Sequence, residues 1–439
     1  MRIAWFTPLS KRTGIAKYSL AAIKALSEKA QIDIWTNYRE DNFEITDFAV
    51  NEAIVNEENV AKLAKYDAVI YNIGNNIEYH CEIFEFYKKL KGIVILHDRI
   101  MHHFFVDYVL AKHKSPQVYM NIIDYYYGTD GKKAAARSFN KGPRIWETEE
   151  YVKYPLFEFF LWNALGLIVH SQDTLKKIPA RFNFLPSICL DPPFDPQEIH
   201  SIAAPFLTRE SLGIPKDKIT LLSHGSFGKM RRIEKVFEVI KHNPQIRKNV
   251  YYVIAGDSGY AANLKKSIAG FGLENEVKLT GFVDDRMLYS LIKNADVCIN
   301  LRFPSTESSS WSLLEQMALE KPVIVTKTAF YKELPDDAVV KIGMEDETKN
   351  IAEALNFLIA DQDFRKKIAN NALRYVEETY GPAKYAGNFL AFLDSIQTKD
   401  VFLDFVDDVT DELSRFGVPE LNKRLVDDIA RETSAFSIN

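Results

Sequence analysis

Cysteine is scarce in this chain, and long apolar runs are absent. The three cysteines, Cys81, Cys189 and Cys298, lie far apart among 439 residues and form neither a C-x-x-C pair nor a metal-ligand spacing. We therefore expect them to be reduced and the protein to be cytoplasmic. No apolar run reaches the roughly 18 residues that a membrane-spanning helix needs. The first residues enter a strand pattern at once, so we expect no signal peptide.

Neither sign of charge dominates the chain. It holds 55 Lys and Arg against 60 Asp and Glu, a net charge of −5, which argues against nucleic acid as a partner. The excess of acid lies in the tail, because residues 399–439 carry ten acidic and five basic side chains. Apolar residues recur there at helical spacing, so we expect two acidic amphipathic helices packed on the body. A surface for a protein partner is a second hypothesis for this tail.

Common ligand-binding motifs are missing as well. No G-x-G-x-x-G fingerprint of dinucleotide binding occurs, and Met230 stands where a P-loop needs Ser or Thr after Gly228-Lys229. The single D-x-D, Asp361-Gln-Asp363, lies between helical segments and not at a strand end. It predicts a helix cap instead of a metal site. We expect neither a metal nor a cofactor.

Short β-branched runs alternate with longer segments of helical period, which is typical of α/β domains with parallel sheets. The expected strands are residues 2–6, 31–35, 68–71, 93–96 and 167–170 in the first half, and 219–224, 251–255, 277–280, 297–300 and 323–325 in the second. Between the two series, Asp191-Pro-Pro-Phe-Asp-Pro196 is too rich in proline for either element and predicts a linker.

This pattern predicts two Rossmann-like domains, each a doubly wound parallel sheet, that face a cleft lined by the carboxyl ends of both sheets. We assign residues 1–200 to the first domain and 201–383 to the second. A helix occupies 384–398, and the helical tail occupies 399–439.

Two glutamates eight residues apart are the most informative feature of the second half. Glu307 follows the expected strand 297–300, and Glu315 falls on the next helix, about two turns inside it. Carboxylates accept hydrogen bonds from ribose and hexose hydroxyls. Between them, Ser309 and Ser310 present backbone N–H groups at a helix start, which suits a phosphate. The plain alternative is a loop carboxylate followed by a surface residue of a helix.

A glycine turn with nearby cations opens the second half. Gly225 follows the expected strand 219–224, and Lys229, Arg231 and Arg232 come soon after it. Backbone N–H groups of such a turn, together with basic side chains, bind phosphate groups. A basic helix start that faces solvent is the alternative interpretation.

These two motifs resemble those of retaining glycosyltransferases of family 4, and the resemblance covers residues 1–398. It implies the GT-B fold, with the last helix packed back on the first domain. It also implies transfer of a hexose from a nucleoside diphosphate sugar to the hydroxyl of a saccharide, either lipid-linked or polymeric. In that family's pattern Glu307 contacts the donor sugar, Glu315 holds the ribose, and Gly225 and Arg231 bind the diphosphate.

The chain departs from the family pattern at two places. Ser226 stands where the family often has an arginine, so Lys229 or Arg232 is the expected replacement. Serines at positions 308–310 replace glycines of the family, but they still offer backbone N–H groups to a phosphate.

Polar residues of the first half are expected on the acceptor side of the cleft. Gly14 and Ile15 resemble the glycine loop that follows the first strand of the family. His97 and Asp98 end the strand 93–96, where a reactive histidine would face the cleft, with a structural histidine as the alternative. Asn75 follows the strand 68–71 and can meet either substrate.

Aromatic and basic residues gather in residues 120–162. We expect helical core there and one solvated basic loop, which contains Lys132, Lys133, Arg137, Lys141 and Arg144. The sharper hypothesis is a surface that receives a lipid-linked acceptor or makes peripheral contact with the inner face of a membrane.

Other function classes stay open. A sugar-nucleotide epimerase of the same fold would turn over its substrate without an acceptor, and a phosphorylase would need a lysine-bound pyridoxal phosphate. A catalytically degenerate scaffold that binds nucleotide sugar is the non-enzymatic alternative, because the serine replacements weaken the match to the family.

Overall fold

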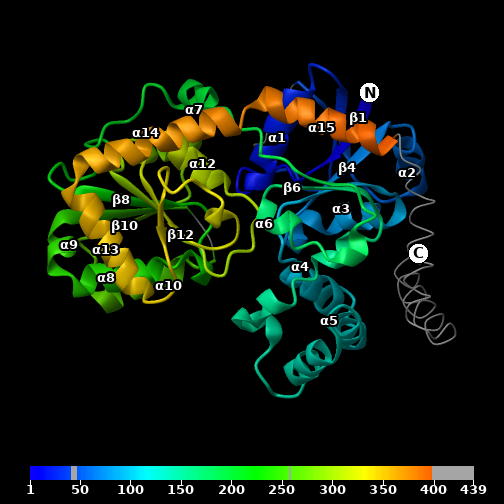
Figure 1. Ribbon diagram of the computed structural model, residues 1–439, viewed down its shortest axis with the longest axis horizontal. Coiled ribbons are helices and arrows are strands. Elements are labelled where there is room, and N and C mark those ends of the chain that lie inside the picture. Colours follow the sequence, from blue (N-terminus) through cyan, green and yellow to red (C-terminus); the bar gives the residue numbers. More distant parts are fainter. Residues whose placement is uncertain (41–46, 257–258, 398–439) are drawn as a thin grey trace.

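The computed structural model describes residues 1–40, 47–256 and 259–397, which form two parallel sheets covered by helices (Figure 1). The first sheet has seven strands in the order β3-β2-β1-β4-β5-β6-β7, and the second has six in the order β10-β9-β8-β11-β12-β13. In both sheets the strand order reverses beside the first strand of the domain, as in other doubly wound folds. The predicted fold class is confirmed.

All expected strands are present, and three short edge strands were not predicted: β3, β7 and β13. The strands are β1 (Arg2–Phe6), β2 (Gln31–Thr36), β3 (Ala49–Glu52), β4 (Ala68–Ile73), β5 (Gly92–Leu96), β6 (Ala164–Val169), β7 (Ser187–Cys189), β8 (Ile219–His224), β9 (Val250–Ala255), β10 (Val277–Gly281), β11 (Val297–Asn300), β12 (Val323–Thr326) and β13 (Val340–Ile342).

Helices cover both faces of each sheet, and the strands are therefore apolar on both sides. Along β1, Ile3 and Trp5 pack into one hydrophobic cluster while Ala4 and Phe6 pack into another. The helices outside the excursion described below are α1 (Gly14–Leu26), α2 (Glu57–Leu63), α3 (Ile77–Lys89), α6 (Gln172–Leu175), α7 (Pro196–Ala203), α8 (Ile233–His242), α9 (Pro244–Asn249), α10 (Ala261–Phe271), α11 (Asp285–Asn294), α12 (Trp311–Ala318), α13 (Glu347–Ala360), α14 (Gln362–Thr379) and α15 (Pro382–Gln397).

The chain crosses between the domains at residues 190–195, which form neither helix nor strand. Helix α7 follows at once, and its Ile199 and Ala203 lie in the core of the second domain beside α11 and α12. The boundary that we predicted at residue 200 is therefore too late, because α7 already belongs to the second domain.

Helix α15 returns to the first domain and packs on α1, which is the place that the resemblance implied. The hydroxyl groups of Tyr385 and Tyr18 lie 2.5 Å apart, and the rings of Phe389 and Trp5 lie 5.7 Å apart. Helices α14 and α15 thus run along one side of both domains (Figure 1). The predicted cap is also present, since Asp361 accepts from the Phe364 amide at the start of α14.

A helical excursion projects from the first domain between β5 and β6 (Figure 1). It contains α4 (His102–Val106), the π-helix η1 (Asp107–Lys112), α5 (Pro116–Phe139) and three 3-10 turns, η2 (Ile145–Glu147), η3 (Glu149–Lys153) and η4 (Phe157–Phe160). Lys132, Lys133 and Arg137 lie on α5, so the basic loop that we predicted is helical at these three positions.

Among the described residues, no helix is both long and apolar enough to span a bilayer. The tail helices predicted for residues 399–439 lie outside the described residues.

Candidate functional site

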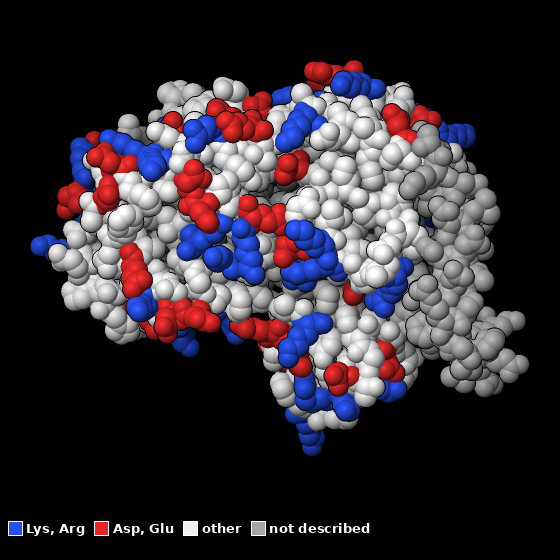
Figure 2. Space-filling model, viewed as in Figure 1, with Lys and Arg blue, Asp and Glu red and all other residues white. Residues whose placement is uncertain are grey.

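The carboxyl ends of both sheets meet between the domains, and a short antiparallel bridge joins them there. Asp98, just after β5, pairs with Glu307 in the loop after β11. The Ser308 amide donates to the His97 carbonyl oxygen over 3.0 Å. The loop that carries Glu307 is thus held against the first domain. Figure 2 shows acidic and basic side chains crowded at this meeting line.

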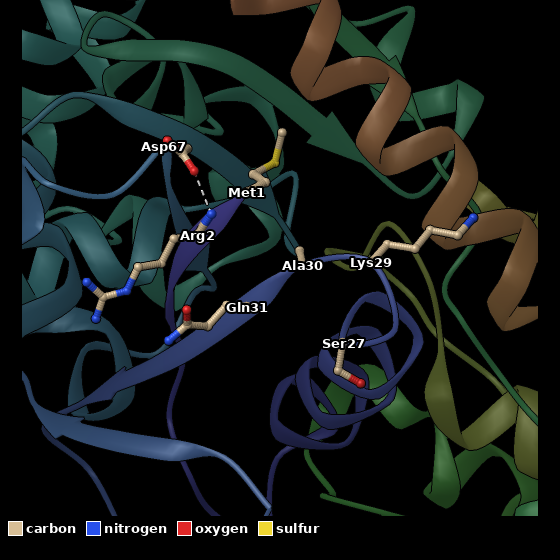
Figure 3. Close-up of a pocket in the computed structure, with 7 residues that line it drawn as sticks. All are labelled: Met1, Arg2, Ser27, Lys29, Ala30, Gln31 and Asp67. Atoms are coloured by element: carbon tan, nitrogen blue, oxygen red, sulfur yellow. Dashed lines mark hydrogen bonds between the residues drawn. The ribbon is translucent and has the colours of Figure 1, made fainter.

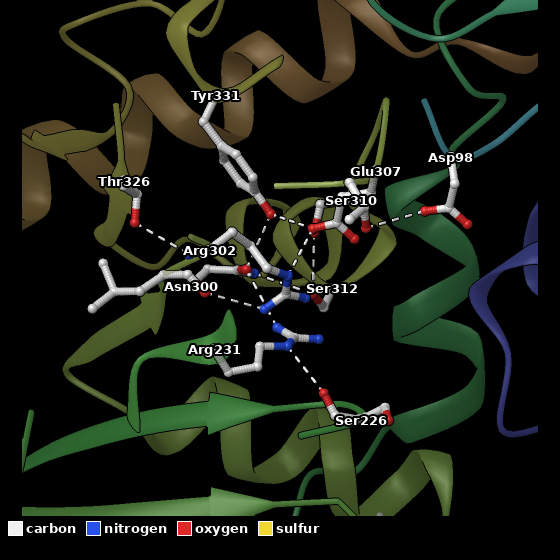
Figure 4. A network of polar contacts seen from close by, with 12 residues as sticks. Asp98, Ser226, Arg231, Asn300, Arg302, Glu307, Ser310, Ser312, Thr326 and Tyr331 are labelled. Carbon is white, nitrogen blue, oxygen red and sulfur yellow. Dashed lines mark hydrogen bonds and ion pairs between the residues drawn. The ribbon is translucent and has the colours of Figure 1, made fainter. Parts of the chain in front are cut away.

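Two arginines lie side by side on the second domain's wall of the cleft (Figure 4). Arg231 ends the 3-10 turn η6 (Lys229–Arg231), and Arg302 lies just after β11. The Nε of Arg231 donates to the Ser226 carbonyl oxygen over 3.0 Å. Burial and the neighbouring Arg302 lower the pKa of Arg231 to about 9. Because adjacent cations repel each other, the pair suits an anion with several oxygens.

Glu307 compensates one of these cations. Arg302 Nε donates to Glu307 Oε1 over 2.8 Å, and the Tyr331 hydroxyl donates to the same oxygen over 2.6 Å. The Arg302 side chain is 5% exposed and that of Glu307 is 25% exposed. Glu307 therefore sits at the edge of the site with one oxygen already bound.

Glu315 is buried and paired with a residue of the other domain. Its side chain is 3% exposed, and Lys17 Nζ from α1 donates to its Oε1 over 2.8 Å. The Tyr289 hydroxyl of α11 reaches the same oxygen at 3.3 Å. Helix α12 begins at Trp311, so Glu315 lies little more than one turn inside it, and our expectation of two turns is wrong.

His224 connects Glu315 to the arginine pair. It ends β8, and its Nδ1 lies 3.8 Å from Glu315 Oε2. Burial and the charges of Arg231, Lys17 and Arg302 lower the pKa of His224 to about 3, so the ring is neutral and the contact is no ion pair. The site is thus a continuous strip with two cations at one end and a buried carboxylate at the other.

The other basic residues nominated from the sequence lie apart from this strip. Arg232 binds Glu347 of α13 through two nitrogens, which holds its guanidinium away from a ligand. Lys229 is exposed and makes no ion pair with any residue that the structure describes. Ser310 is the N-cap residue of α12, but its hydroxyl contacts Ser312 and does not cap.

The position of the Arg231 guanidinium leaves no room for a side chain at residue 225, so a glycine is needed there. The φ of Gly225 is +105°, and a Cβ there would lie 2.8 Å from an Nη atom of Arg231.

Ser309 lies in the loop before α12 and is half-buried. Among residues 1–40, 47–256 and 259–397, the Ser309 hydroxyl has no hydrogen-bond partner.

His97 is held as a neutral structural ring. Its Nε2 lies 2.9 Å from Asn72 Oδ1, and the ring packs against Tyr18 and His170 at centroid distances of 4.8 and 5.2 Å. Burial and the two nearby histidines, His170 and His80, hold its pKa well below the ordinary value. The geometry therefore favours the structural alternative for this side chain.

Asp98 and Asn75 form a turn beside the cleft. Asp98 Oδ2 accepts from the Asn75 amide over 2.9 Å, and Asn75 Oδ1 accepts from the Phe104 amide over 2.9 Å. Burial and the charge of Glu307 raise the pKa of Asp98 to about 6. Asp98 is thus a titratable group of the first domain that faces the Glu307 loop.

Gly14 and Ile15 begin α1 at the domain contact. A Cβ on Gly14 would lie 3.5 Å from the Trp311 Cβ, so α1 and α12 approach each other closely here. Ile15 packs on the backbone of Gly74, which makes it a packing residue. Gly14 is exposed at this edge, whereas Ile15 is half-buried.

A shallow depression lies at the opposite edge of the first sheet, at the amino ends of β1 and β2 (Figure 3). Its wall includes Arg2, whose amide donates to Asp67 Oδ2 over 2.6 Å. Ligands of doubly wound domains bind at the carboxyl ends of the strands, so this depression is not the candidate site.

Sequence reasoning missed Arg302, Lys17, Tyr289 and Tyr331. Arg302 lies five residues before Glu307, and its position just after β11 was an available signal. The other three reach the site from elements far away in the sequence, and no local pattern marks them.

Residues 206–375 match the family described as glycosyl transferases group 1. The second half carries a glycosyltransferase domain. Arg231, Arg302, Glu307 and Glu315 all lie within the matched residues of this domain.

Two curated relatives match part of the chain. An uncharacterized glycosyltransferase of Methanocaldococcus jannaschii is 31% identical over 176 residues, which are 39% of this chain and 44% of the relative. The alpha-D-kanosaminyltransferase of Streptomyces kanamyceticus is 26% identical over 166 residues, or 37% of this chain and 42% of that enzyme. The match thus spans less than half the length of each relative.

The solved structures resemble the whole fold. The Anabaena protein HepE, crystallised in complex with UDP-glucose, superposes with a TM-score of 0.61 at 15% identity, covering 90% of this chain and all of that chain. At this identity the likeness establishes the fold, which is GT-B.

Proposed function

We propose that the protein is a retaining glycosyltransferase of family 4 that moves a hexose from a nucleoside diphosphate sugar to a saccharide hydroxyl. One observation carries the proposal: the strip from the Arg231–Arg302 pair through neutral His224 to buried Glu315, inside a glycosyltransferase domain. A diphosphate matches the cations, and ribose hydroxyls match the carboxylate. Arg302 takes the part for which the sequence nominated Lys229 or Arg232.

The reaction in this proposal runs on one face of the sugar. The bond between the anomeric carbon and the phosphate oxygen breaks, and its electron pair leaves with the diphosphate, whose charge Arg231 and Arg302 stabilise. The acceptor oxygen bonds to the anomeric carbon on the same face. Its proton passes to the departing phosphate oxygen. Glu307 accepts hydrogen bonds from the donor sugar and stabilises the oxocarbenium character of the transition state.

The donor is proposed on the chemistry of the strip and is supported by likeness of fold. The complex of Anabaena HepE with UDP-glucose shows that another GT-B protein binds a nucleotide sugar, but it does not identify the base or sugar of this chain. We propose that fixed arginine charges replace a divalent metal and that no cofactor takes part.

The acceptor is proposed to enter from the first domain, beside Gly14, Asn75 and Asp98. A lipid-linked or polymeric saccharide would then lie near the helical excursion. Three of the five basic residues nominated for membrane contact form ion pairs, Lys132 with Asp124, Arg137 with Glu150 and Arg144 with Glu147. The hypothesis of peripheral contact at the cytoplasmic face of a membrane therefore depends chiefly on Lys133 and Lys141.

A turnover assay tests the proposal. Purified protein is incubated with each nucleoside diphosphate sugar in turn, with and without mixed oligosaccharide acceptors, and release of nucleoside diphosphate is followed. Proton NMR of the product sugar then gives its anomeric configuration. We expect release of nucleoside diphosphate with one donor and a product of retained configuration. Glu307→Gln should abolish this release and form no product.

The outcomes separate the alternatives. Inversion of configuration would contradict the retaining mechanism. Isomerisation of the donor without an acceptor would indicate the epimerase. Binding of nucleotide without any turnover would favour the scaffold. The ion pairs of Glu307 with Arg302 and of Glu315 with Lys17 are structural observations in favour of that alternative.

A further inference from the structure

Lys17 is a cation of the first domain that reaches into the second. It lies on α1, 298 positions away from Glu315 in the sequence, and its Nζ donates to Glu315 Oε1 over 2.8 Å. The same Nζ lies 3.2 Å from Oδ1 of Asp285 and 5.5 Å from the ring centroid of Tyr289. Burial lowers the pKa of Lys17, but Glu315, Tyr289 and Asp285 outweigh it, and the net pKa is raised. The ammonium is thus charged and shared between two carboxylates.

The two carboxylates differ in burial. The Glu315 side chain is 3% exposed, whereas that of Asp285 is 46% exposed. Within the described residues, hydrogen bonds to the Glu315 carboxylate reach only Oε1, which accepts from both Lys17 and Tyr289. A ribose diol needs both carboxylate oxygens to bind in a bidentate way, so it competes with Lys17 for Oε1.

We propose that Lys17 is an interdomain latch that occupies the ribose-binding carboxylate of the unliganded protein and is displaced by the nucleotide. This inference rests on the proposed function, in which Glu315 holds the ribose. On displacement Lys17 keeps Asp285 as its partner, so no cation is left unpaired in the cleft. The exposed second carboxylate is what makes the exchange possible, because stranding a buried ammonium would cost several kcal/mol.

The latch couples nucleotide binding to the domain contact. Lys17 comes from α1, and α1 touches α12 where Gly14 meets Trp311. Release of Lys17 from α12 breaks the ion pair with Glu315 but leaves the packing of α1 on α12 in place. Only molecules in which Glu315 is free bind nucleotide. The apparent association constant is therefore the intrinsic constant multiplied by the fraction of such molecules.

Calorimetric titration of the full chain and of its Lys17 and Asp285 variants with UDP, GDP, ADP and dTDP in turn tests the latch. Lys17→Met removes the competitor and should tighten binding by roughly tenfold, as expected when about nine-tenths of the molecules are latched. Asp285→Asn removes the alternative partner and should weaken binding severalfold. In the double variant the effect of Asp285→Asn should vanish, because no ammonium remains to be accommodated.

A matched control is available on the same helix. Lys24 of α1 also pairs with a residue beyond the linker, Glu198 at 3.4 Å, but lies outside the strip. Lys24→Met should leave the affinity unchanged, and Lys17→Arg, which keeps the charge, should resemble the wild type.

Each outcome decides between the latch and the proposed function. Weaker or unchanged binding in Lys17→Met, with the wild type binding normally, would overturn the latch and leave the proposed function standing. Binding by Lys17→Met alone would support a latch that is almost always closed. No binding by either protein would overturn both.

Discussion

The Ser308 hydroxyl donates to the His97 carbonyl oxygen over 2.8 Å, and its amide donates to the same carbonyl over 3.0 Å. A third contact joins this hydroxyl to the Leu96 carbonyl oxygen at 3.1 Å. Ser308 is fully buried between the domains. A glycine, as in the family pattern, could make only the amide bond. The serine thus gives this chain an extra tie between the Glu307 loop and the first domain.

Ser308→Ala should lower the free energy of unfolding by about 1 kcal/mol, because a buried hydroxyl donor is lost while its acceptors stay buried. Urea unfolding followed by tryptophan fluorescence measures the change. Ser309→Ala, one residue further along, removes a hydroxyl without an identified bond and should leave the midpoint unchanged. Equal losses in both variants would mean that the loop as a whole, not the Ser308 hydroxyl, sets the effect.

Arg302→Gln should weaken the binding of inorganic pyrophosphate roughly 10- to 100-fold, since one charge-assisted contact to phosphate is removed. Pyrophosphate serves as the probe because it lacks base and sugar. Lys229→Gln is the comparison, and we expect a change of no more than about twofold, as for an exposed charge. A larger loss of pyrophosphate affinity in Lys229→Gln than in Arg302→Gln would indicate that Lys229, the loop cation predicted from the sequence, binds the phosphate.

Arg232→Gln should act on stability and not on binding. Glu347 is 6% exposed and would be left without its cation, at a cost of roughly 2–4 kcal/mol. Chemical unfolding gives this loss, and calorimetry checks that pyrophosphate affinity is kept. Lys235→Gln in α8, the helix that follows Arg232, breaks only the exposed pair with Glu238 and should cost no more than about 0.5 kcal/mol. A stable Arg232→Gln protein with lost affinity would contradict this assignment.

Asp98→Asn should stabilise the protein above about pH 6 and not below about pH 4. Burial and the charge of Glu307 raise the pKa of Asp98 from its ordinary 3.8 to about 6, so the folded state favours the protonated carboxyl. Stability from this proton is complete below the unfolded pKa and is lost as pH rises through the folded one. Thermal unfolding at pH 4 and pH 8 measures the difference between variant and wild type. The control variant Glu377→Gln changes an exposed side chain and should give the same stability difference from the wild type at both pH values. An equal gain in stability for Asp98→Asn at pH 4 and pH 8 would contradict the role of the Asp98 proton.

Much of the fold was predictable because local sequence patterns determine where its strands and helices lie. The β-branched runs located the strands of both sheets, and the carboxyl-end rule located the cleft without any side-chain contact. The edge strands β3, β7 and β13 were missed because they are short and only partly buried, so no apolar run marks them. Helix α7 was assigned to the wrong domain because its sequence does not say which core it joins.

The site was predictable only in its residue types. The spacing of Glu307 and Glu315 identified two carboxylates in the cleft, but not the partners that hold them. Lys17 is 298 residues from Glu315, and Glu347 is 115 residues from Arg232. Pairings at such distances depend on the packed tertiary structure. A basic loop in the sequence therefore could not reveal which of its cations is free for a ligand.

The central claim is that the Arg231–Arg302 pair and Glu315 form a nucleoside diphosphate site. Calorimetric titration of UDP, GDP, ADP and dTDP into the wild-type protein and into Arg231→Gln tests it most directly. We predict one-to-one binding of one nucleotide, weakened roughly 10- to 100-fold in the variant, as for loss of a charge-assisted phosphate contact. Absence of binding by all four nucleotides, to the wild type and also to Lys17→Met, or equal affinity in wild type and Arg231→Gln, would contradict the claim.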